Sequence, residues 1–271
     1  MPSLIDAAGT EHRSVASAPR IVSLVPSITE LVCELGLADR LVGRTGFCVH
    51  PRETLKRIPK VGGTKDVNLE KLRALTPSHV ILNIDENRKD TVDEIARFAP
   101  HVIVTHPLAP LDNLDLYRLI GGIFGREHEA LDLCDRFERA HRAAVSAATS
   151  FEPRRVLYLI WREPWMTVAR DTYISRMLAL VNWHTVPDDA VDRYPRIALD
   201  EIQLAEIDAV LLSSEPYMFR ERHVAEMRAM PTLRAKTVAL IDGEMTSWYG
   251  SRAIAGLEYL PRYRRGLDAS R

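Results

Sequence analysis

Two side chains with reactive chemistry, Cys48 and His50, lie two residues apart in the segment FCVHP. This segment follows an apolar run, residues 41–45, that predicts a strand. In extended backbone, residues i and i+2 face the same side, so this thiolate and imidazole could contact one ligand or metal ion. Because two ligands do not complete a metal shell, we favour a polar lining of a cleft over a metal site. A Cys–His nucleophilic pair remains an alternative, although the sequence indicates neither an oxyanion hole nor an orienting group.

Polar side chains follow the next predicted strand, residues 79–84, in the segment NIDENR. We expect Asn83, Glu86 and Asn87 to line the same wall of the cleft as the Cys–His pair. Asp85 and Glu86 could act as paired carboxylates, but adjacent residues diverge in direction. The sequence therefore favours ligand binding over acid–base chemistry at this position.

Aromatic side chains gather at or beyond the ends of the strands predicted in the second half of the chain. This group contains Trp161, Trp165, Tyr194, Tyr217, Phe219, Trp248 and Tyr249. Charged neighbours such as Arg162 and Arg252 accompany them. In open parallel sheets, ligands bind beyond the carboxyl ends of the strands, and rigid aromatics with a few charges suit a large, flat, partly apolar ligand. The alternative is that these rings cap the core or pin loops.

Motifs of common catalytic sites are missing from the sequence. There is no GxSxG elbow, P-loop, HExxH or GxGxxG. Gly62-Gly63-Thr64-Lys65 lacks the upstream glycine of a phosphate loop and is better explained as a turn. We therefore predict that the protein is not an enzyme.

Composition further restricts the class of protein to which the chain can belong. The 271 residues are 46% hydrophobic and 27% charged, with 36 Lys and Arg against 37 Asp and Glu. This balance argues against a nucleic-acid partner, and no stretch approaches the roughly 20 apolar residues of a membrane span. Three scattered cysteines do not form a disulfide framework. The balanced charge is in keeping with a monomer.

The elements that must position these residues are short apolar strands alternating with helices. Further strands are predicted at residues 21–25, 102–105, 156–160, 209–213 and 238–241. The alternation predicts parallel sheets of the α/β class. Ser27 to Glu30 has the form of a capping box and predicts a helix that ends near Gly36.

The middle of the chain, residues 112–149, is predicted to be helical with a break around Gly121, Gly122 and Gly125. Its second part, residues 127–149, would be roughly 34 Å long at about 1.5 Å per residue. The predicted organisation is a disordered tail (1–19), an N-terminal α/β lobe (20–111), a backbone helix linker (112–149) and a C-terminal α/β lobe (150–271).

An internal repeat supports two equivalent lobes. LEKL and VILN at residues 69–72 and 80–83 match LDEI and VLLS 130 positions later, and residues 20–25 match 155–160 at an offset of 135. Glu70 and Asp200 would then occupy equivalent helix starts. Such acidic groups either complement the helix dipole, worth about 0.3–1 kcal/mol each, or form a pair of docking points for a symmetric partner.

The segments RIVSLVPSITELVCELGLADRLVGRT, PKVGGT and NLEKLRALTPSHVIL resemble the N-terminal lobe of class III substrate-binding proteins of ABC importers, the helical-backbone receptors for vitamin B12, iron-siderophores and haem. ALDEIQLAEIDAVLL resembles the counterpart in the second lobe. The resemblance covers residues 20–262. FCVHP, DENR, IWREPWMTVARDTYIS, SSEPYMF and DGEMTSWYGSR are most similar to the cobalamin-binding-protein-like branch.

The resemblance implies two α/β lobes with central parallel sheets flanked by helices, joined by one long backbone helix, and a metal chelate held in the cleft between them. Cobalamin or another corrinoid is the first expectation, and haem or an iron-siderophore the second. Stacking faces are expected from Trp161, Trp165, Tyr217, Trp248 and Tyr249, and polar contacts from Arg162, Arg252, Asn83, Glu86 and Asn87. Cys48 or His50 could contact the metal, with His50 as the axial ligand. No prosthetic group is expected.

The same resemblance implies a partner and a compartment. Glu70 and Asp200 match the acidic residues that dock onto a membrane permease, and Glu201 could replace Asp200. The family is periplasmic, but residues 1–19 lack the basic start and apolar run of a signal peptide. A cytoplasmic location is therefore the alternative expectation, with an intracellular corrinoid- or metal-chelate-handling protein or enzyme that uses a reactive Cys48/His50 cleft.

Overall fold

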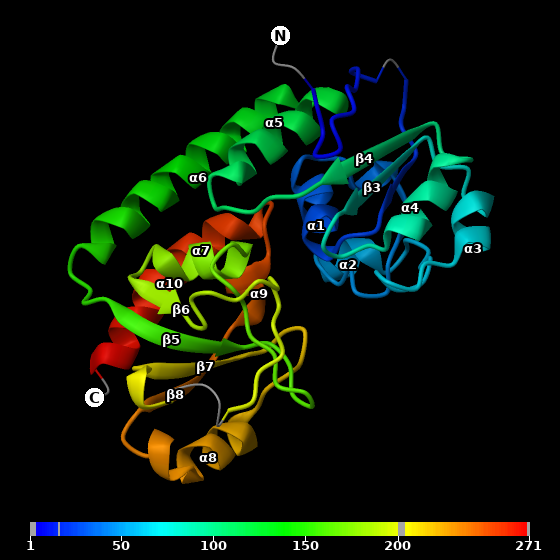
Figure 1. Ribbon diagram of the computed structural model, residues 1–271. Coiled ribbons are helices and arrows are strands. Elements are labelled where there is room, and N and C mark those ends of the chain that lie inside the picture. The colour runs from blue at the N-terminus through cyan, green and yellow to red at the C-terminus, as the bar shows by residue number, and fades with distance from the viewer. Residues whose placement is uncertain (1–3, 16, 200–203, 270–271) are drawn as a thin grey trace. The chain divides into compact units, whose positions relative to one another are not determined.

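The computed structural model describes residues 4–15, 17–199 and 204–269 (Figure 1). The chain divides into two compact lobes. The N-terminal lobe comprises residues 1–107, 111–137 and 249–252, and the C-terminal lobe comprises residues 108–110, 138–248 and 253–271. The division differs from the predicted ranges, since residues 108–110 belong to the C-terminal lobe and the first part of the predicted linker, up to residue 137, belongs to the N-terminal lobe. The long helix is shared between the lobes, and a four-residue segment from near the end of the chain belongs to the first lobe.

Each lobe contains one parallel sheet of four strands. In the N-terminal lobe these are β1 (Ile21–Ser23), β2 (Leu41–Arg44), β3 (His79–Asn83) and β4 (His101–Thr105), in the order β2-β1-β3-β4. In the C-terminal lobe they are β5 (Arg154–Leu159), β6 (Trp183–Thr185), β7 (Ala209–Ser213) and β8 (Thr237–Ile241), in the order β6-β5-β7-β8. The predicted α/β class with two parallel sheets is confirmed.

The two sheets repeat one another in register as well as in order. Ile21 pairs with His79 in the first sheet, and Val156 pairs with Ala209 in the second. These partners are separated by the offsets of 135 and 130 found in the sequence. The predicted internal repeat is therefore confirmed at the level of strand pairing.

Helices flank each sheet. The long helix α6 (Glu127–Ala148) connects the two lobes along the chain, since its residues up to 137 belong to the N-terminal lobe and the rest to the C-terminal lobe. The N-terminal lobe contains α1 (Pro26–Glu34), α2 (Arg52–Leu55), α3 (Leu69–Ala74), α4 (Lys89–Ala96), α5 (Asp112–Ile123) and a 3-10 turn at Ala38–Arg40. The C-terminal lobe contains α7 (Tyr173–Ala179), α8 (Glu221–Ala229), α9 (Gly243–Ser247), most of α10 (Arg252–Ala269) and 3-10 turns at Leu204–Glu206 and Pro231–Leu233. None of the helices in the described ranges is both long and apolar enough to cross a membrane.

The break predicted around three glycines is found at Gly125, between α5 and α6, whereas Gly121 and Gly122 lie within α5 and do not interrupt it. Gly125 adopts a positive φ of 63°, a conformation that glycine reaches without the steric penalty of a side chain. Helix α6 then runs for 22 residues. The prediction of a long helix after a glycine break is confirmed.

The start of α1 differs from the predicted capping box. Val25 is the N-cap, and no side chain caps the helix. The Glu30 carboxylate instead accepts two hydrogen bonds from the Arg252 guanidinium, at 2.8 and 2.6 Å. A tertiary ion pair with a residue 222 positions away has replaced the local contact, and a local motif cannot reveal such a partner.

The structure also differs from the predicted disordered tail, because the described residues 4–15 pack on the N-terminal lobe. The buried Asp6 carboxylate accepts hydrogen bonds from the Val104 amide at 2.9 Å and lies 3.0 Å from His12 Nε2. Ala7 donates back to the Val104 carbonyl at 2.9 Å. These contacts join the segment to the edge strand β4, which explains why a polar sequence is ordered here.

His79 begins β3 and is buried close to this segment. Its ring stacks on His101 with centroids 4.6 Å apart and meets the edge of Phe124 at 5.1 Å. Burial, together with the neighbouring His101 and His12, lowers the pKa of His79 to about 4. The folded lobe therefore favours neutral His79.

A buried cation lies in the C-terminal lobe. Arg264 of α10 is fully buried, and its guanidinium lies 5.6 Å from the Phe151 ring and 5.1 Å from the Trp183 ring. Its Nε donates to Asp268 at 3.0 Å, and its Nη2 donates to the Glu152 carbonyl at 2.8 Å. The charge is thus compensated by a carboxylate, a carbonyl and two aromatic faces.

Candidate functional site

Large apolar side chains are exposed at the carboxyl ends of strands in the N-terminal lobe. Phe47 and Val49, which follow β2, are 63% and 45% exposed, and Ile84, which follows β3, is 48% exposed. A Cβ at Gly63 would lie 3.3 Å from the Phe47 ring, so the glycine lets this ring lie close to the backbone. The sequence analysis missed these residues. Their signal is an apolar side chain among turn residues directly after a strand.

Cys48 does not line an open surface. It is 1% exposed, and its Sγ accepts a hydrogen bond from Thr29 Oγ1 at 3.0 Å and lies 3.1 Å from Thr45 Oγ1. Burial raises the pKa of the thiol, although these hydrogen bonds and Arg44 oppose the shift. The prediction that Cys48 contacts a ligand is corrected, because α1 and the end of β2 enclose the thiol.

His50 lies in the same loop but in a different environment. β2 ends at Arg44, residues 46 and 47 form a turn, and His50 is half-buried just before Pro51, the N-cap of α2. Cys48 is thus enclosed while His50 is half-buried, so the two side chains have different surroundings. Within the described ranges, no three His, Cys, Asp or Glu side chains form a group that could hold a metal ion. A role for His50 as an axial ligand stays a prediction.

Asn83 and Asn87 hold the loop after β3 rather than point outward. Both are buried. Asn83 Oδ1 accepts from the Asp85 amide at 2.8 Å, while Asn87 Oδ1 accepts from the Asn83 amide at 2.9 Å and its Nδ2 donates to the Thr64 carbonyl at 2.9 Å. The prediction that these amides orient a ligand is corrected, because buried amides satisfy the loop backbone instead.

Glu86 and Tyr249 bind one another within the N-terminal lobe. The Tyr249 hydroxyl donates to Glu86 Oε1 at 2.5 Å. Burial raises the pKa of Tyr249 well above its ordinary value, and the Glu86 carboxylate raises it further. Tyr249 is only 7% exposed, and the half-buried Arg252 is paired with Glu30. The segment that carries Tyr249 and Arg252 is therefore tied to the lobe, and Tyr249 does not present a stacking face.

Charged groups that the sequence analysis did not select lie at the same end of β3 and β4. Lys65 donates to the Asp85 carbonyl at 2.7 Å, and His106 Nε2 lies 3.3 Å from Asp85 Oδ1. Lys65 comes from the predicted GGTK turn, which the antiparallel bridge between Gly62 and Val67 confirms. The carboxyl edge of this sheet thus combines exposed apolar side chains with a few charged ones.

In the C-terminal lobe, the predicted aromatic residues form a cluster at the carboxyl ends of β5 and β7. We call it the aromatic cluster, and it consists of Trp161, Trp165, Tyr217, Phe219 and His223. Trp161 is 39% exposed and meets the edge of Tyr217 at 5.7 Å, while Trp165 stacks on Phe219 at 6.1 Å. The inner rings belong to the lobe's core, and the outermost ring faces solvent.

Arg162 is held beside this cluster. Its guanidinium lies 5.6 Å from the Trp165 ring, and its Nη1 lies 2.8 Å from Glu226 Oε2. Met218, a neighbour in sequence of Tyr217, is 58% exposed. The cluster therefore offers apolar surface with the Arg162 guanidinium next to it.

Trp248 differs from the prediction of an exposed stacking face. It is 7% exposed, and its indole N–H donates to Glu215 Oε2 at 2.8 Å. The carboxylate satisfies the indole nitrogen, which allows the ring to be buried. This prediction is corrected in favour of the alternative that the ring pins a loop.

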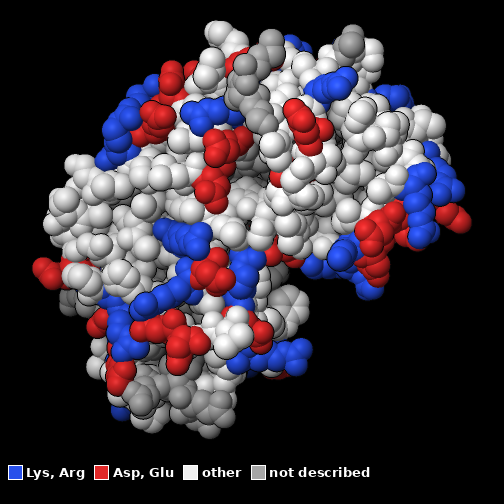
Figure 2. Space-filling view, turned by 45° about the horizontal axis from the view of Figure 1, so that its top comes forward, with Lys and Arg blue, Asp and Glu red and all other residues white. Residues whose placement is uncertain are grey.

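Of the two predicted docking residues, the structure describes Glu70 but not Asp200. Glu70 is exposed in the first turn of α3, where Asn68 caps the helix by accepting from the Lys71 amide at 2.9 Å. Asp200 lies outside the described residues, as does Glu201. Figure 2 shows Lys and Arg interspersed with Asp and Glu on the viewed face, in keeping with the net charge of −1.

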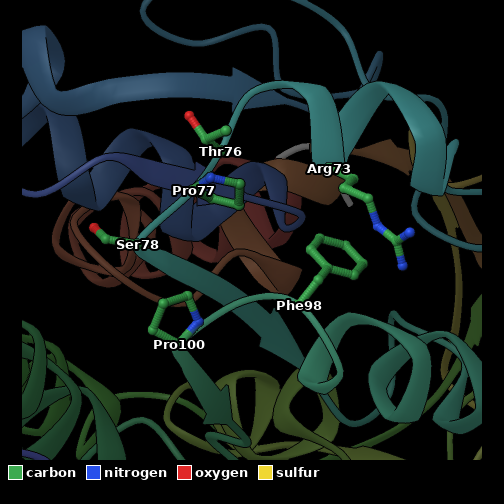
Figure 3. Close-up of a pocket in the computed structure, with 6 residues that line it drawn as sticks. All are labelled: Arg73, Thr76, Pro77, Ser78, Phe98 and Pro100. Atoms are coloured by element: carbon green, nitrogen blue, oxygen red, sulfur yellow. The ribbon is translucent and has the colours of Figure 1, made fainter.

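A surface pocket of about 410 Å³ lies elsewhere on the N-terminal lobe (Figure 3). It is lined by Arg73, Thr76, Pro77, Ser78, Phe98 and Pro100. These residues directly precede β3 and β4, so the pocket lies at the amino ends of these strands. None of the predicted site residues lines it.

The chain is similar in sequence to a known protein family and to a vitamin B12-binding protein. A sequence profile described as periplasmic binding protein matches residues 21–243. The vitamin B12-binding protein of Vibrio vulnificus (strain CMCP6) is 22% identical over 261 residues, which cover 95% of each chain.

Solved structures with the same fold include a vitamin B12-binding protein and a heme-binding protein. The periplasmic vitamin B12 binding protein BtuF of Vibrio cholerae matches with a TM-score of 0.79 and 18% identity over 93% of this chain and 98% of that chain. The periplasmic heme-binding protein RhuT from Roseiflexus sp. RS-1 matches with a TM-score of 0.80 and 22% identity over 93% and 99%. These matches confirm the predicted fold of two α/β lobes with a long helix.

Proposed function

The chain belongs to the periplasmic binding protein family, and on this premise we propose that it binds a metal chelate as the substrate-binding component of an ABC uptake system. Cobalamin or another corrinoid is the first candidate, and haem or an iron-siderophore the second. Similarity to a vitamin B12-binding protein over 95% of both chains favours the corrinoid. Family members are binding proteins, and we propose a binding function without catalysis for this chain.

The observation that carries the proposal is the placement of exposed apolar side chains. In each lobe they lie in loops that follow the carboxyl ends of parallel strands, with Phe47 and Ile84 in one lobe and Trp161 and Met218 in the other. Ligands of open parallel sheets bind at this edge. A large chelate with an apolar ring system suits surfaces that combine such side chains with a few charges.

The reactive-cleft alternative required a Cys48 thiol with a depressed pKa. Burial instead raises the pKa of that thiol, and the side chain is enclosed. A thiol with these properties is a poor nucleophile at neutral pH. We therefore propose no enzymatic role for the loop that carries Cys48 and His50.

Partners and location follow from the proposed function. The exposed carboxylate of Glu70 is suited to docking onto a basic surface of a permease, and we retain Asp200 as its proposed counterpart. The chelate is proposed as cargo, not as a resident cofactor. We propose a periplasmic location, which the described relatives share.

Isothermal titration with cyanocobalamin, cobinamide, haemin and a ferric siderophore tests the proposal. We expect a dissociation constant in the micromolar range or below for one of them. Trp161→Ala and Phe47→Ala should each weaken binding by about 5- to 30-fold, the equivalent of about 1–2 kcal/mol for a well-placed anchor.

Leu131→Ala provides the matched control, because Leu131 is 58% exposed on α6, away from the strand ends. It should bind with the wild-type constant. Absence of binding with all four compounds would refute the chelate proposal. Equal losses in all three variants would refute the assignment of the binding surface to the strand ends.

A further inference from the structure

His223 is a buried member of the aromatic cluster that the sequence analysis did not select. It is the third residue of α8 and is 1% exposed. Its Nδ1 accepts a hydrogen bond from the Arg220 amide at 2.8 Å, and its own amide donates to the Arg220 carbonyl at 2.8 Å. The imidazole therefore caps the start of α8 and fixes the end of the preceding loop.

The same ring supports the exposed part of the cluster. It packs against Tyr217 with centroids 5.6 Å apart and against Phe219 at 5.4 Å, both edge to face. Tyr217 in turn supports Trp161 at 5.7 Å. A continuous chain of ring contacts thus joins His223 to the exposed indole of Trp161.

Both ring nitrogens of His223 face N–H donors. The Arg220 amide points to Nδ1, and Arg222 Nε lies 3.2 Å from Nε2. A neutral imidazole can accept at one nitrogen, whereas an imidazolium carries hydrogen on both nitrogens and accepts at neither. With Nδ1 accepting from the Arg220 amide, the neutral ring carries its hydrogen on Nε2, where the Tyr217 hydroxyl oxygen lies at 3.4 Å; protonation adds a second hydrogen at Nδ1, directly opposite the Arg220 N–H, and removes that hydrogen bond.

We propose that His223 is a positioning residue for the aromatic cluster, and that its protonation loosens α8 and Tyr217 and so displaces the exposed face of Trp161. The consequence for binding rests on the proposed function. A ligand that uses Trp161 would bind more weakly as the pH falls.

The charges around His223 favour its neutral form at neutral pH. Groups that face it from its own and neighbouring elements are the guanidinium groups of Arg222 and Arg162, the carboxylate of Glu226, the backbone of Arg220 and the Tyr217 hydroxyl, at 3.4 Å from Nε2. Burial lowers the pKa of His223, the two guanidinium groups lower it further, and Glu226 opposes them. Since an unfolded histidine titrates at about 6.5, the folded cluster loses stability as the pH falls below that value.

His223→Asn is the conservative variant that tests the proposal. The asparagine Oδ1 can take the place of Nδ1 as acceptor for the Arg220 amide, but asparagine does not titrate. His184→Asn is the matched control, because His184 is exposed on β6 of the same lobe. His223→Leu removes both the acceptor and the titration.

The first measurement uses the ligand-free protein. Trp161 and Trp165, two of the four tryptophans, belong to the aromatic cluster, so the fluorescence between pH 8 and pH 4.5 includes a signal from it. We expect a reversible transition in the wild type and in His184→Asn that His223→Asn abolishes. The same transition in His223→Asn would overturn the proposal, with or without ligand binding.

The second measurement is titration with cyanocobalamin at pH 7.5 and pH 5.0. We expect the wild type to lose affinity at pH 5.0 to the extent that Trp161→Ala loses it at pH 7.5, and His223→Asn to show a flat profile. Tight binding that is independent of pH would overturn the inference and leave the proposed function intact. Absence of binding together with the fluorescence transition would refute cyanocobalamin as ligand and uphold the role of His223.

Discussion

Helix α10 contains two glycines, and their replacement by alanine should change stability in opposite directions. A Cβ at Gly256 would lie 2.3 Å from the backbone carbonyl oxygen of Met245 and 3.2 Å from Met177 Cε, whereas a Cβ at Gly266 would meet nothing within 4 Å. Met245 belongs to α9, so the missing side chain at Gly256 allows α9 and α10 to pack closely. Gly266 is exposed near the end of α10.

The expected magnitude follows from this geometry. Real Cβ atoms essentially never lie closer than 3.0 Å to such an atom, so the Met245 oxygen must retreat by at least 0.7 Å. Overpacking of this kind costs about 1–3 kcal/mol, and the helix propensity of alanine offsets up to about 1 kcal/mol of that cost. We expect Gly256→Ala to lower the free energy of unfolding by about 1–2 kcal/mol, and Gly266→Ala to raise it by up to about 1 kcal/mol.

Urea unfolding monitored by tryptophan fluorescence is the appropriate assay, because all tryptophans lie in the lobe that contains both glycines. If Gly256→Ala were as stable as Gly266→Ala, the close approach of α9 to α10 would not be what requires glycine at this position.

Three further predictions concern buried groups. Asp268→Asn should lower the free energy of unfolding by about 2–4 kcal/mol, because it leaves the fully buried Arg264 guanidinium without its carboxylate partner; fluorescence-detected urea unfolding measures it, and Arg264→Met should cost less, because Asp268 keeps Arg154 Nη1 at 2.5 Å. Between pH 7 and pH 5 the wild type should lose about 1–2 kcal/mol more stability than His79→Phe, because unfolded histidine takes up a proton below about pH 6.5 while folded His79 resists it down to about pH 4. Circular dichroism should detect this difference, and the exposed His128→Asn should behave as the wild type. Cys48 should react with iodoacetamide only after unfolding, as followed by mass spectrometry, and fast labelling of the native protein would contradict its burial.

The strands could be predicted because their apolar runs are continuous. Residues 209–213 form β7 as expected, since a central parallel strand is buried on both faces and needs no polar alternation. β6 was missed because it has three residues, one of which is the exposed His184. The repeat offset could be read from the sequence because equivalent strands keep similar apolar residues.

The site residues were harder to predict because burial depends on tertiary partners. Cys48 was expected at a surface, but Thr29 from α1 encloses it. Trp248 was expected to stack on a ligand, but Glu215, 33 residues away, satisfies its indole nitrogen. Residue type and position after a strand placed these side chains at the carboxyl edge of each sheet, whereas the contact of each side chain depended on distant residues.

The four-residue segment 249–252 also bears on how the protein is made. It supplies the N-terminal lobe with the partners of Glu30 and Glu86 and with a Gly250 backbone that bonds to Asn113 and Tyr117. During synthesis at about 5–20 residues per second, these residues are added roughly 6–23 s after residue 137. The N-terminal lobe leaves the ribosome first but cannot complete these contacts until residues 249–252 have been synthesised. Until then, the carboxylates of Glu30 and Glu86 lack these partners in the nascent lobe.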